Sequence, residues 1–137
     1  MQDLVSIITP TYNSADFIAD TIECILAQTY QNWELLITDD CSSDNTVEIV
    51  LSYAQKDKRI RLFRLETNSG GGVSRNNSIK EANGRYIAFC DSDDRWTKNK
   101  LEVQVAFMKE KDTAFSYGSY MLCDEDDKEL GINICLS

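Results

Sequence analysis

The sequence predicts an α/β fold in which helices cover both faces of a mostly parallel sheet. Two observations lead to this class. Short apolar runs alternate along the chain with segments of helical period. The resulting order, β-α-β-α-β-α-β-α-β, is typical of strands joined by helical crossovers. The 137 residues are long enough to bury one hydrophobic core, so we expect a single domain spanning residues 1–137.

Each strand is predicted from a short apolar run bounded by turn residues. Residues 5–9 form the first run, and Pro10 is expected to end it because proline lacks the N–H of a strand residue. Residues 60–64 alternate in polarity, which indicates a half-buried or edge strand. The other strands are expected at residues 33–38, 86–90 and 114–120. The acidic run 124–128 is interpreted as a hairpin tip, and the apolar residues 132–136 as the start of another element.

Four helices are predicted between these strands. The first is expected to be capped by Ser14 or Asp16 and the second by Asp44, since these side chains accept hydrogen bonds from free backbone N–H groups. A glycine cluster at residues 70–72 precedes a helix over residues 73–82, and Thr97 begins the fourth helix. Three of these helices are expected to have an apolar face towards the core. The face of the first helix is Phe17, Ile18, Ile22, Ile25 and Leu26, and that of the second is Val47, Val50, Leu51 and Ala54. The face of the fourth helix is Leu101, Val105 and Met108.

Composition excludes several classes of function. The formal net charge is −9, which argues against nucleic acid as a partner. The chain has no histidine, so catalysis by Ser-His-Asp or Cys-His groups and histidine-ligated zinc are excluded within it. Five cysteines without a CxxC spacing indicate a reducing compartment. We expect no signal peptide and no membrane span, because no apolar stretch approaches roughly 20 residues.

Three carboxylates in four positions, Asp91-Ser92-Asp93-Asp94, directly follow the apolar run 86–90. Like charges packed so closely favour a bound cation. The carboxyl ends of parallel strands are where open α/β sheets bind ligands, and a divalent ion carrying phosphate oxygens would suit this position. A solvated acidic turn is the alternative, although one Asp or Asn suffices for a turn.

Two other loops, residues 9–13 and 39–44, are expected to reach the same edge of the sheet. Tyr12 offers a ring on which a base could stack, or it is a core or rim tyrosine. Asp40 can accept the imide N–H of a pyrimidine. Arg75 could orient Asp93 or contact a phosphate, or it is a surface arginine. The glycine cluster matches neither a P-loop nor a dinucleotide fingerprint.

Five segments in this order resemble the N-terminal half of the inverting glycosyltransferases of family 2, and the resemblance runs from about residue 5 to residue 120. The segments are residues 5–13, 26–30, 34–46, 72–76 and 84–94, which read VSIITPTYN, LAQTY, ELLITDDCSSDNT, GVSRN and GRYIAFCDSDD. The resemblance implies a Rossmann-like GT-A fold, of which this chain would be a truncated, nucleotide-sugar-binding portion.

The resemblance also implies roles for single residues. Pro10, Thr11 and Tyr12 would hold the nucleobase, and Asp40 would pair with the edge of uracil or thymine. Arg75 would lie near the base and the phosphates. The remaining roles fall on the D-x-D motif: Asp91 and Ser92 would contact the nucleotide, and Asp93 would hold Mg²⁺ or Mn²⁺ with Asp91 and Asp94 in support. Cys41 stands where the family often has glycine, which restricts the turn.

The implied activity is metal-assisted transfer of a sugar, with inversion, from a UDP- or dTDP-sugar to a saccharide or lipid-linked acceptor. Polysaccharide or glycoconjugate synthesis in the cytoplasm, at the inner face of the membrane, would be its setting, with any peripheral membrane contact made by other sequence. No residue matches the family's catalytic base, which is expected beyond Ser137. Two alternatives stay open: a non-catalytic nucleotide-binding fragment, and a sugar nucleotidyltransferase. The second is disfavoured, because residues 9–14 contain no glycine or basic residue.

Overall fold

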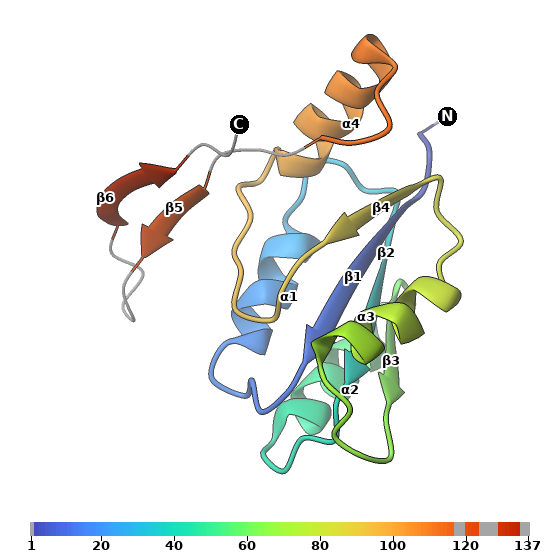
Figure 1. Ribbon diagram of the computed structural model, residues 1–137, viewed down its shortest axis with the longest axis vertical. Helices are drawn as coiled ribbons and strands as arrows, with labels where there is room; N and C mark the ends of the chain where they lie inside the picture. The colour runs from blue at the N-terminus through green and yellow to red at the C-terminus, as the bar shows by residue number, and fades with distance from the viewer. Residues whose placement is uncertain (1, 117–119, 124–128, 135–137) are drawn as a thin grey trace. The chain divides into compact units, whose positions relative to one another are not determined.

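The computed structural model describes residues 2–116, 120–123 and 129–134 of the chain. These residues fall into two compact units, which divide after Lys100. The first unit holds a four-stranded sheet and three helices (Figure 1). The second holds one helix and a two-stranded sheet.

The sheet of the first unit is parallel throughout, as the alternating pattern predicts. Its strands are β1 (Val5–Thr11), β2 (Trp33–Asp39), β3 (Ile60–Arg64) and β4 (Tyr86–Phe89). They lie in the order β3-β2-β1-β4, so β1 is paired on both sides. The order reverses direction at β1, and the crevice between β1 and β4 is the point where such sheets commonly bind ligands.

Helices cover both faces of this sheet. Figure 1 shows α3 (Gly71–Lys80) in front of the strands, with α1 (Ile18–Leu26) and α2 (Thr46–Lys56) behind them. The central strands are buried on both faces, because consecutive residues such as Ile7 and Ile8 are completely shielded from solvent. The fully buried apolar side chains of this core include Ile7, Ile8, Ile18, Ile22, Ile25, Leu35, Leu36 and Ile37.

Helix α3 contacts the sheet through small polar side chains. Ser78 is buried, and its hydroxyl lies 2.7 Å from that of Thr38 and 3.1 Å from the carbonyl oxygen of Leu36, to which it donates. Ser74 is also buried and donates to the carbonyl of Gly70. Hydrogen-bonded serines let the helix approach β1 and β2 closely, which the hydrophobic pattern alone does not indicate.

The prediction that Pro10 ends the first strand is wrong, because β1 continues to Thr11. Pro10 pairs in register with Thr38 of β2, whereas β4 ends opposite Ile8. The carbonyl of Ile8 points towards β4, where it accepts from the N–H of Cys90, so the same side of Pro10 faces the region beyond the end of β4. A missing N–H breaks no ladder hydrogen bond there.

The predicted helices α1 and α2 exist, but their ends and exposed faces differ in detail. Helix α1 has no side-chain cap; the backbone carbonyl of Ser14 accepts from the N–H groups of Phe17 and Ile18. Phe17 therefore lies outside the helix and is 49% exposed. Asp44 lies one residue before Asn45, the N-cap of α2, and its carboxylate accepts from the N–H of the first helical residue, Thr46, at 3.0 Å. Leu51 lies on the solvent side of α2, because it is exposed.

The second unit contains α4 (Lys100–Lys111), β5 (Tyr120–Cys123) and β6 (Glu129–Ile134). Leu101 and Val105 are buried as expected. The strand predicted at residues 114–120 is wrong at residues 114–116, and residues 117–119 lie outside the described residues. Strand β5 pairs antiparallel with β6, since the segment between them is too short for a parallel crossover. The predicted hairpin tip at residues 124–128 and the tail residues 135–136 also lie outside the described residues.

Among the described residues, no helix combines the length and apolar character needed to cross a lipid bilayer.

Candidate nucleotide-binding site

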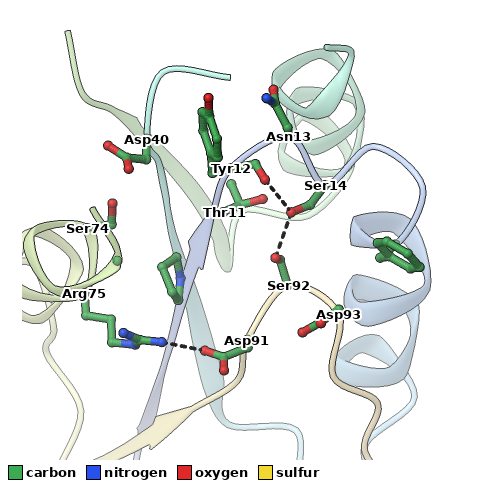
Figure 2. A pocket seen from close by; sticks show the side chains of 13 residues that line it. Thr11, Tyr12, Asn13, Ser14, Asp40, Ser74, Arg75, Asp91, Ser92 and Asp93 are labelled. Carbon is green, nitrogen blue, oxygen red and sulfur yellow. Dashed lines mark hydrogen bonds and ion pairs between the residues drawn. The ribbon is translucent and has the colours of Figure 1, made fainter. Parts of the chain in front are cut away.

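A pocket of about 430 Å³ lies where β1, β2 and β4 end and α3 begins (Figure 2). Its position matches the reversal of strand order in the sheet. The three loops that the sequence predicts to converge all contribute to it. The pocket is lined by Pro10, Thr11, Tyr12, Asn13, Ser14, Phe17, Asp40, Gly71, Ser74, Arg75, Asp91, Ser92 and Asp93.

The loop after β1 supplies an exposed aromatic ring and a buried hydroxyl. Tyr12 is 51% exposed, so it is a rim residue with a free face rather than part of the core. Thr11 is buried, and its hydroxyl has no hydrogen-bond partner among the described residues. Most buried hydroxyls have a hydrogen-bond partner, so the unpaired Thr11 hydroxyl is an unusual feature beside the pocket.

Asn13 joins this loop to the loop after β2. Its backbone has a φ of +46°, a region that asparagine tolerates better than most residues. Its side-chain oxygen accepts from the N–H of Ser43 at 2.9 Å, and its own N–H donates to Ser42 Oγ at 2.9 Å. The two loops therefore form one connected rim, which fixes Tyr12 relative to Asp40.

The turn that presents Asp40 is built by its neighbours. Asp39 is buried at the end of β2, and its carboxylate accepts from both the N–H and the hydroxyl of Ser42, at 2.9 and 2.5 Å. Asp39 is thus a turn former. Cys41 has a φ of +66°, which is unfavourable for a residue with a side chain and explains why glycine suits this position.

Asp40 binds the glycine segment with both carboxylate oxygens. It is buried, and it accepts from the N–H of Ser69 at 2.6 Å and from that of Gly70 at 2.8 Å. Gly70 has a φ of +95°, which only glycine adopts readily. A carboxylate at this point also interacts favourably with the N-terminal dipole of α3. Since a carboxylate has about four acceptor positions, Asp40 keeps the capacity to accept a further N–H.

Arg75 reaches across the pocket from α3 to the acidic loop. Its guanidinium lies 3.0 Å from Asp91 Oδ1, so the carboxylate that it orients is that of Asp91 rather than Asp93 (Figure 2). A Cβ atom on Gly71 would lie only 3.2 Å from the Arg75 Nη1 atom, so Gly71 leaves the path of this side chain open. Tyr12 and Asp40 lie towards one end of the pocket and this ion pair towards the other.

The acidic loop is a tight turn whose carboxylates differ in environment. The N–H of Asp94 donates to the carbonyl of Asp91 at 3.0 Å, and the Asp94 carboxylate accepts from the N–H of Asp91 at 3.3 Å. Burial raises the pKa of Asp94, and the charges of Asp91 and Asp93 add to this effect. Asp94 does not line the pocket, whereas Asp91, Ser92 and Asp93 do.

The carboxylates of the acidic loop fit a divalent cation that is held partly by the protein and partly by a bound ligand. Within the described part of the chain, no three carboxylate, thiol or imidazole groups come together as a complete metal cage. Asp93 nevertheless lines the pocket beside Ser92 and makes no hydrogen bond or ion pair with another described residue. One or two carboxylates, completed by phosphate oxygens and water, are a common environment for Mg²⁺. Asp93, with Asp91 nearby, suits such a shared site.

Of the residues predicted for the site, Pro10, Thr11, Tyr12, Asp40, Arg75, Asp91, Ser92 and Asp93 come together in one pocket, and Asp94 supports the loop behind it. The predicted site residues omit five that also line the pocket: Asn13, Ser14, Phe17, Gly71 and Ser74. In the sequence, Ser14 and Phe17 are interpreted as the cap and the apolar face of the first helix, so neither is assigned to the pocket. Ser74 is buried in the first turns of α3. Only the proximity of distant loops reveals these residues.

Comparison with known proteins agrees with this geometry. The family described as "Glycosyl transferase family 2" matches residues 6–135. The chain belongs to this family, and its fold is the GT-A arrangement that the resemblance implies.

The chain is 49% identical over 127 residues to a putative teichuronic acid biosynthesis glycosyltransferase of Bacillus subtilis. This match covers 93% of the chain and 50% of the relative. It is 47% identical over 123 residues to the Escherichia coli UDP-Glc:α-D-GlcNAc-diphosphoundecaprenol β-1,3-glucosyltransferase WfgD, covering 90% of the chain and 48% of that protein. The chain thus spans about half the length of these curated relatives.

Among solved structures, residues 1–349 of S. aureus TarS in complex with UDP superpose with a TM-score of 0.72 at 38% identity, over 77% of this chain and 32% of that one. A mannosyltransferase from Pyrobaculum calidifontis, in complex with GDP-Man and Mn²⁺, superposes with a TM-score of 0.74 over 93% of this chain and 37% of its own. Its identity of 22% shows a shared fold and no more.

Proposed function

We propose that this chain is the donor-binding part of an enzyme that transfers a sugar from a uridine diphosphate sugar to an acceptor hydroxyl with inversion. One observation carries the proposal. A single pocket joins an exposed aromatic ring and a carboxylate at one end to an Arg–Asp pair and a free carboxylate at the other. A pyrimidine nucleoside diphosphate has the matching sequence of groups: a flat base with an N–H, then two phosphates.

At the first end, the Tyr12 ring stacks on the base and the Asp40 carboxylate accepts the imide N–H of uracil or thymine. Cytosine has no N–H at that position, so Asp40 discriminates against it. Pro10 and Thr11 form the wall beside the base. UDP and UDP-GlcNAc are bound by TarS, which supports uridine over other bases.

At the second end, Arg75 and the acidic loop take the diphosphate. The positively charged guanidinium of Arg75 binds a phosphate oxygen, and the ion pair with Asp91 holds this guanidinium in place. Asp93, with Asp91, would hold Mg²⁺ or Mn²⁺, which neutralises the charge that develops on the departing nucleotide. Ser92 supplies a hydroxyl between the two carboxylates, and Asp94 closes the turn behind them.

Transfer with inversion also needs a carboxylate base that removes the proton of the acceptor hydroxyl on the opposite face of the sugar. We place this base in sequence beyond Ser137, since the chain spans about half of its curated relatives. The name of WfgD includes a diphosphoundecaprenol acceptor, which supports a lipid-linked saccharide as the acceptor here. Such an acceptor would put the enzyme in the cytoplasm, in peripheral contact with the inner face of the membrane.

Calorimetric titration of the 137-residue chain with UDP, in the presence and absence of Mn²⁺, tests the proposal. We expect Mn²⁺ to tighten binding, and Asp93→Asn to abolish this gain because the amide is a neutral and weaker ligand for a hard cation. Asp16→Asn is the matched control, since it removes the same charge from an exposed residue outside the pocket. Equal tightening by Mn²⁺ in the wild type and in Asp93→Asn would contradict the assignment of Asp93.

The donor class is tested separately by thermal shift with UDP, CDP and GDP. The pocket geometry predicts that UDP raises the melting temperature most and CDP least, because of the hydrogen bond to Asp40. A larger shift with GDP would overturn the preference for a pyrimidine.

A non-catalytic role for the chain by itself is the second candidate, and the length of the curated relatives favours it. Sugar transfer by the 137-residue chain is compared with that of a chain extended beyond Ser137. Turnover only in the longer protein supports nucleotide binding without catalysis here. Turnover in the short chain would show that the base lies within it.

A further inference from the structure

A buried threonine behind the pocket contacts the acidic loop. Thr21 lies in α1, is 1% exposed and lines no part of the pocket. Its Oγ1 atom lies 2.8 Å from the carbonyl oxygen of Ser92 and 2.9 Å from that of Asp94. One hydroxyl of α1 therefore shares its single proton between two main-chain carbonyls, one on each side of Asp93.

These contacts matter because, among the described residues, no hydrogen bond or ion pair orients the Asp93 side chain. It is exposed and makes no hydrogen bond or ion pair with another described residue. The direction of its carboxylate is therefore set by the backbone of the loop and by the side-chain rotamer. The Ser92 carbonyl belongs to the peptide unit directly before Asp93, and the Asp94 carbonyl to the unit after Asp94, so the hydroxyl restrains the loop on both sides of Asp93.

Other contacts hold the acidic loop and the residues after it, and Thr21 is the side chain of α1 that reaches the carbonyls next to Asp93. The Ser14 hydroxyl lies 2.8 Å from the Ser92 hydroxyl on the pocket side. Further along, Gln28 Nε2 donates to the carbonyl of Thr97 at 2.7 Å, and the N–H of Thr29 donates to that of Lys98 at 2.8 Å. Helix α1 and the residues after it thus bind the chain from Ser92 to Lys98 at several places.

We propose that Thr21 is a positioning residue for the diphosphate end of the pocket. Its hydroxyl holds the acidic loop in the conformation in which Asp93 can bind a divalent cation together with the diphosphate. The inference rests on the function proposed above, and it adds a residue that contacts neither the nucleotide nor the cation. Polar groups that orient ligating side chains in this way typically affect metal affinity about 10- to 100-fold.

The test compares Thr21→Val, which keeps the shape and removes the hydroxyl, with Thr21→Ser, which keeps the hydroxyl. Thr9→Val is the matched control, because Thr9 is equally buried and its hydroxyl has no partner among the described residues. For each variant, the affinity for UDP is measured by calorimetry with and without Mn²⁺, and the melting temperature is recorded.

Without metal, all variants are expected to bind UDP with affinities within about twofold of one another, since Thr21 does not touch the nucleotide. With Mn²⁺, Thr21→Val is expected to lose about tenfold or more of the metal-dependent gain. Thr21→Ser and Thr9→Val should retain that gain. A merely structural role would lower the melting temperature of Thr21→Val and leave the Mn²⁺ dependence unchanged, which would overturn the proposal.

The outcomes separate this inference from the proposed function. If the wild type gains nothing from Mn²⁺, the proposed metal-assisted function fails. If the wild type gains and Thr21→Val gains equally, only the role of Thr21 fails. Should Thr21→Val not fold, Thr21→Ala and Thr21→Ser provide the same comparison, because both lose the methyl group and only the alanine variant also loses the hydroxyl.

Discussion

Gly84 lies so close to β1 that no other residue fits. A Cβ atom at this position would lie 2.6 Å from Ser6 Oγ, 2.7 Å from the Ser6 nitrogen and 2.8 Å from the Leu4 oxygen. The N–H of Gly84 also donates to Ser6 Oγ at 2.8 Å. This close approach brings the chain into register at the start of β4, where Tyr86 pairs with Val5.

We therefore expect Gly84→Ala to lower the free energy of unfolding by about 2 kcal/mol or more, because two of the three overlapping atoms belong to the backbone. Gly72→Ala is the matched control, since a Cβ there meets nothing within 4 Å. Alanine in α3 should instead stabilise the chain by about 0.5–1 kcal/mol. Urea denaturation of both variants measures the difference, and equal effects would contradict the predicted overlap.

Cys41 provides a second prediction for a single residue. Its φ of +66° costs roughly 1–2 kcal/mol for a residue with a side chain. Glycine relieves this strain but has more conformational freedom in the unfolded chain, which offsets about half of the gain. We expect Cys41→Gly to raise the free energy of unfolding by about 0.5–1 kcal/mol and Cys41→Ala to give no such gain. A larger gain from alanine than from glycine, measured by denaturation, would show that strain is not the cause.

Among the elements, α3 depends on a residue from a different loop. Its first turn is held by Asp40, which accepts two N–H groups at residues 69 and 70. The same helix carries Arg75 to Asp91, so the end of the pocket at Asp40 and the end at Asp91 are joined through one element. A ligand that contacts Asp40 therefore acts on the helix that orients the ion pair.

Asp40→Asn tests this connection. An amide has one acceptor oxygen, so one of the two N–H groups would lose its partner, and the stabilising charge at the start of α3 would disappear. We expect the free energy of unfolding to fall by about 1–2 kcal/mol. Asp16→Asn, which changes an exposed residue outside the described hydrogen bonds, should have little effect in the same denaturation experiment. If both variants are equally stable, Asp40 does not hold α3.

The elements also show what can be predicted from the sequence and what cannot. Residues 60–64 are predicted as a strand with the bounds that the structure has, since polarity alternates along a short run. The extension of β1 through Pro10 could not be predicted, because it depends on where the neighbouring β4 ends. Residues 114–116 have strand-like apolar content, yet β5 begins only at Tyr120, where it pairs with β6.

Some features of the site can also be predicted from the sequence, and others cannot. The convergence of three loops follows from parallel topology, and so the sequence predicts Tyr12, Asp40 and Asp91 near one another. The contacts that fix these groups join residues far apart in the chain, such as Thr21 to Ser92 and Arg75 to Asp91. No periodic pattern marks contacts of this kind, so the sequence does not indicate them.

For the molecule as a whole, acid should weaken the fold through specific carboxylates. The hydrogen bond from Arg59 lowers the pKa of Asp57, and the hydrogen bond from Thr46 lowers that of Asp44. A carboxyl group with a lower pKa in the folded chain stabilises the fold above its unfolded pKa of about 3.8. This stabilisation is lost as the pH falls through the lower, folded value, so it disappears below about pH 4.

Asp57→Asn should therefore reduce the dependence of stability on pH below about pH 4, because asparagine does not titrate there. Asp16→Asn is again the matched control, and it should leave the acid transition unchanged. Thermal unfolding recorded between about pH 2 and pH 6 gives both curves. A transition in Asp57→Asn as steep as that of the wild type would show that Asp57 does not contribute.

The register of β1 and β4 has a consequence for the order in which the chain is assembled. Strand β1 lies inside the sheet, yet Tyr86 follows its partner Val5 by roughly 80 residues. During synthesis from the N-terminus, β1 can pair with β2 early, while its other edge stays unpaired until β4 emerges. A nascent chain arrested before residue 86 would present an apolar strand edge to other molecules, and chaperone binding should concentrate at that stage.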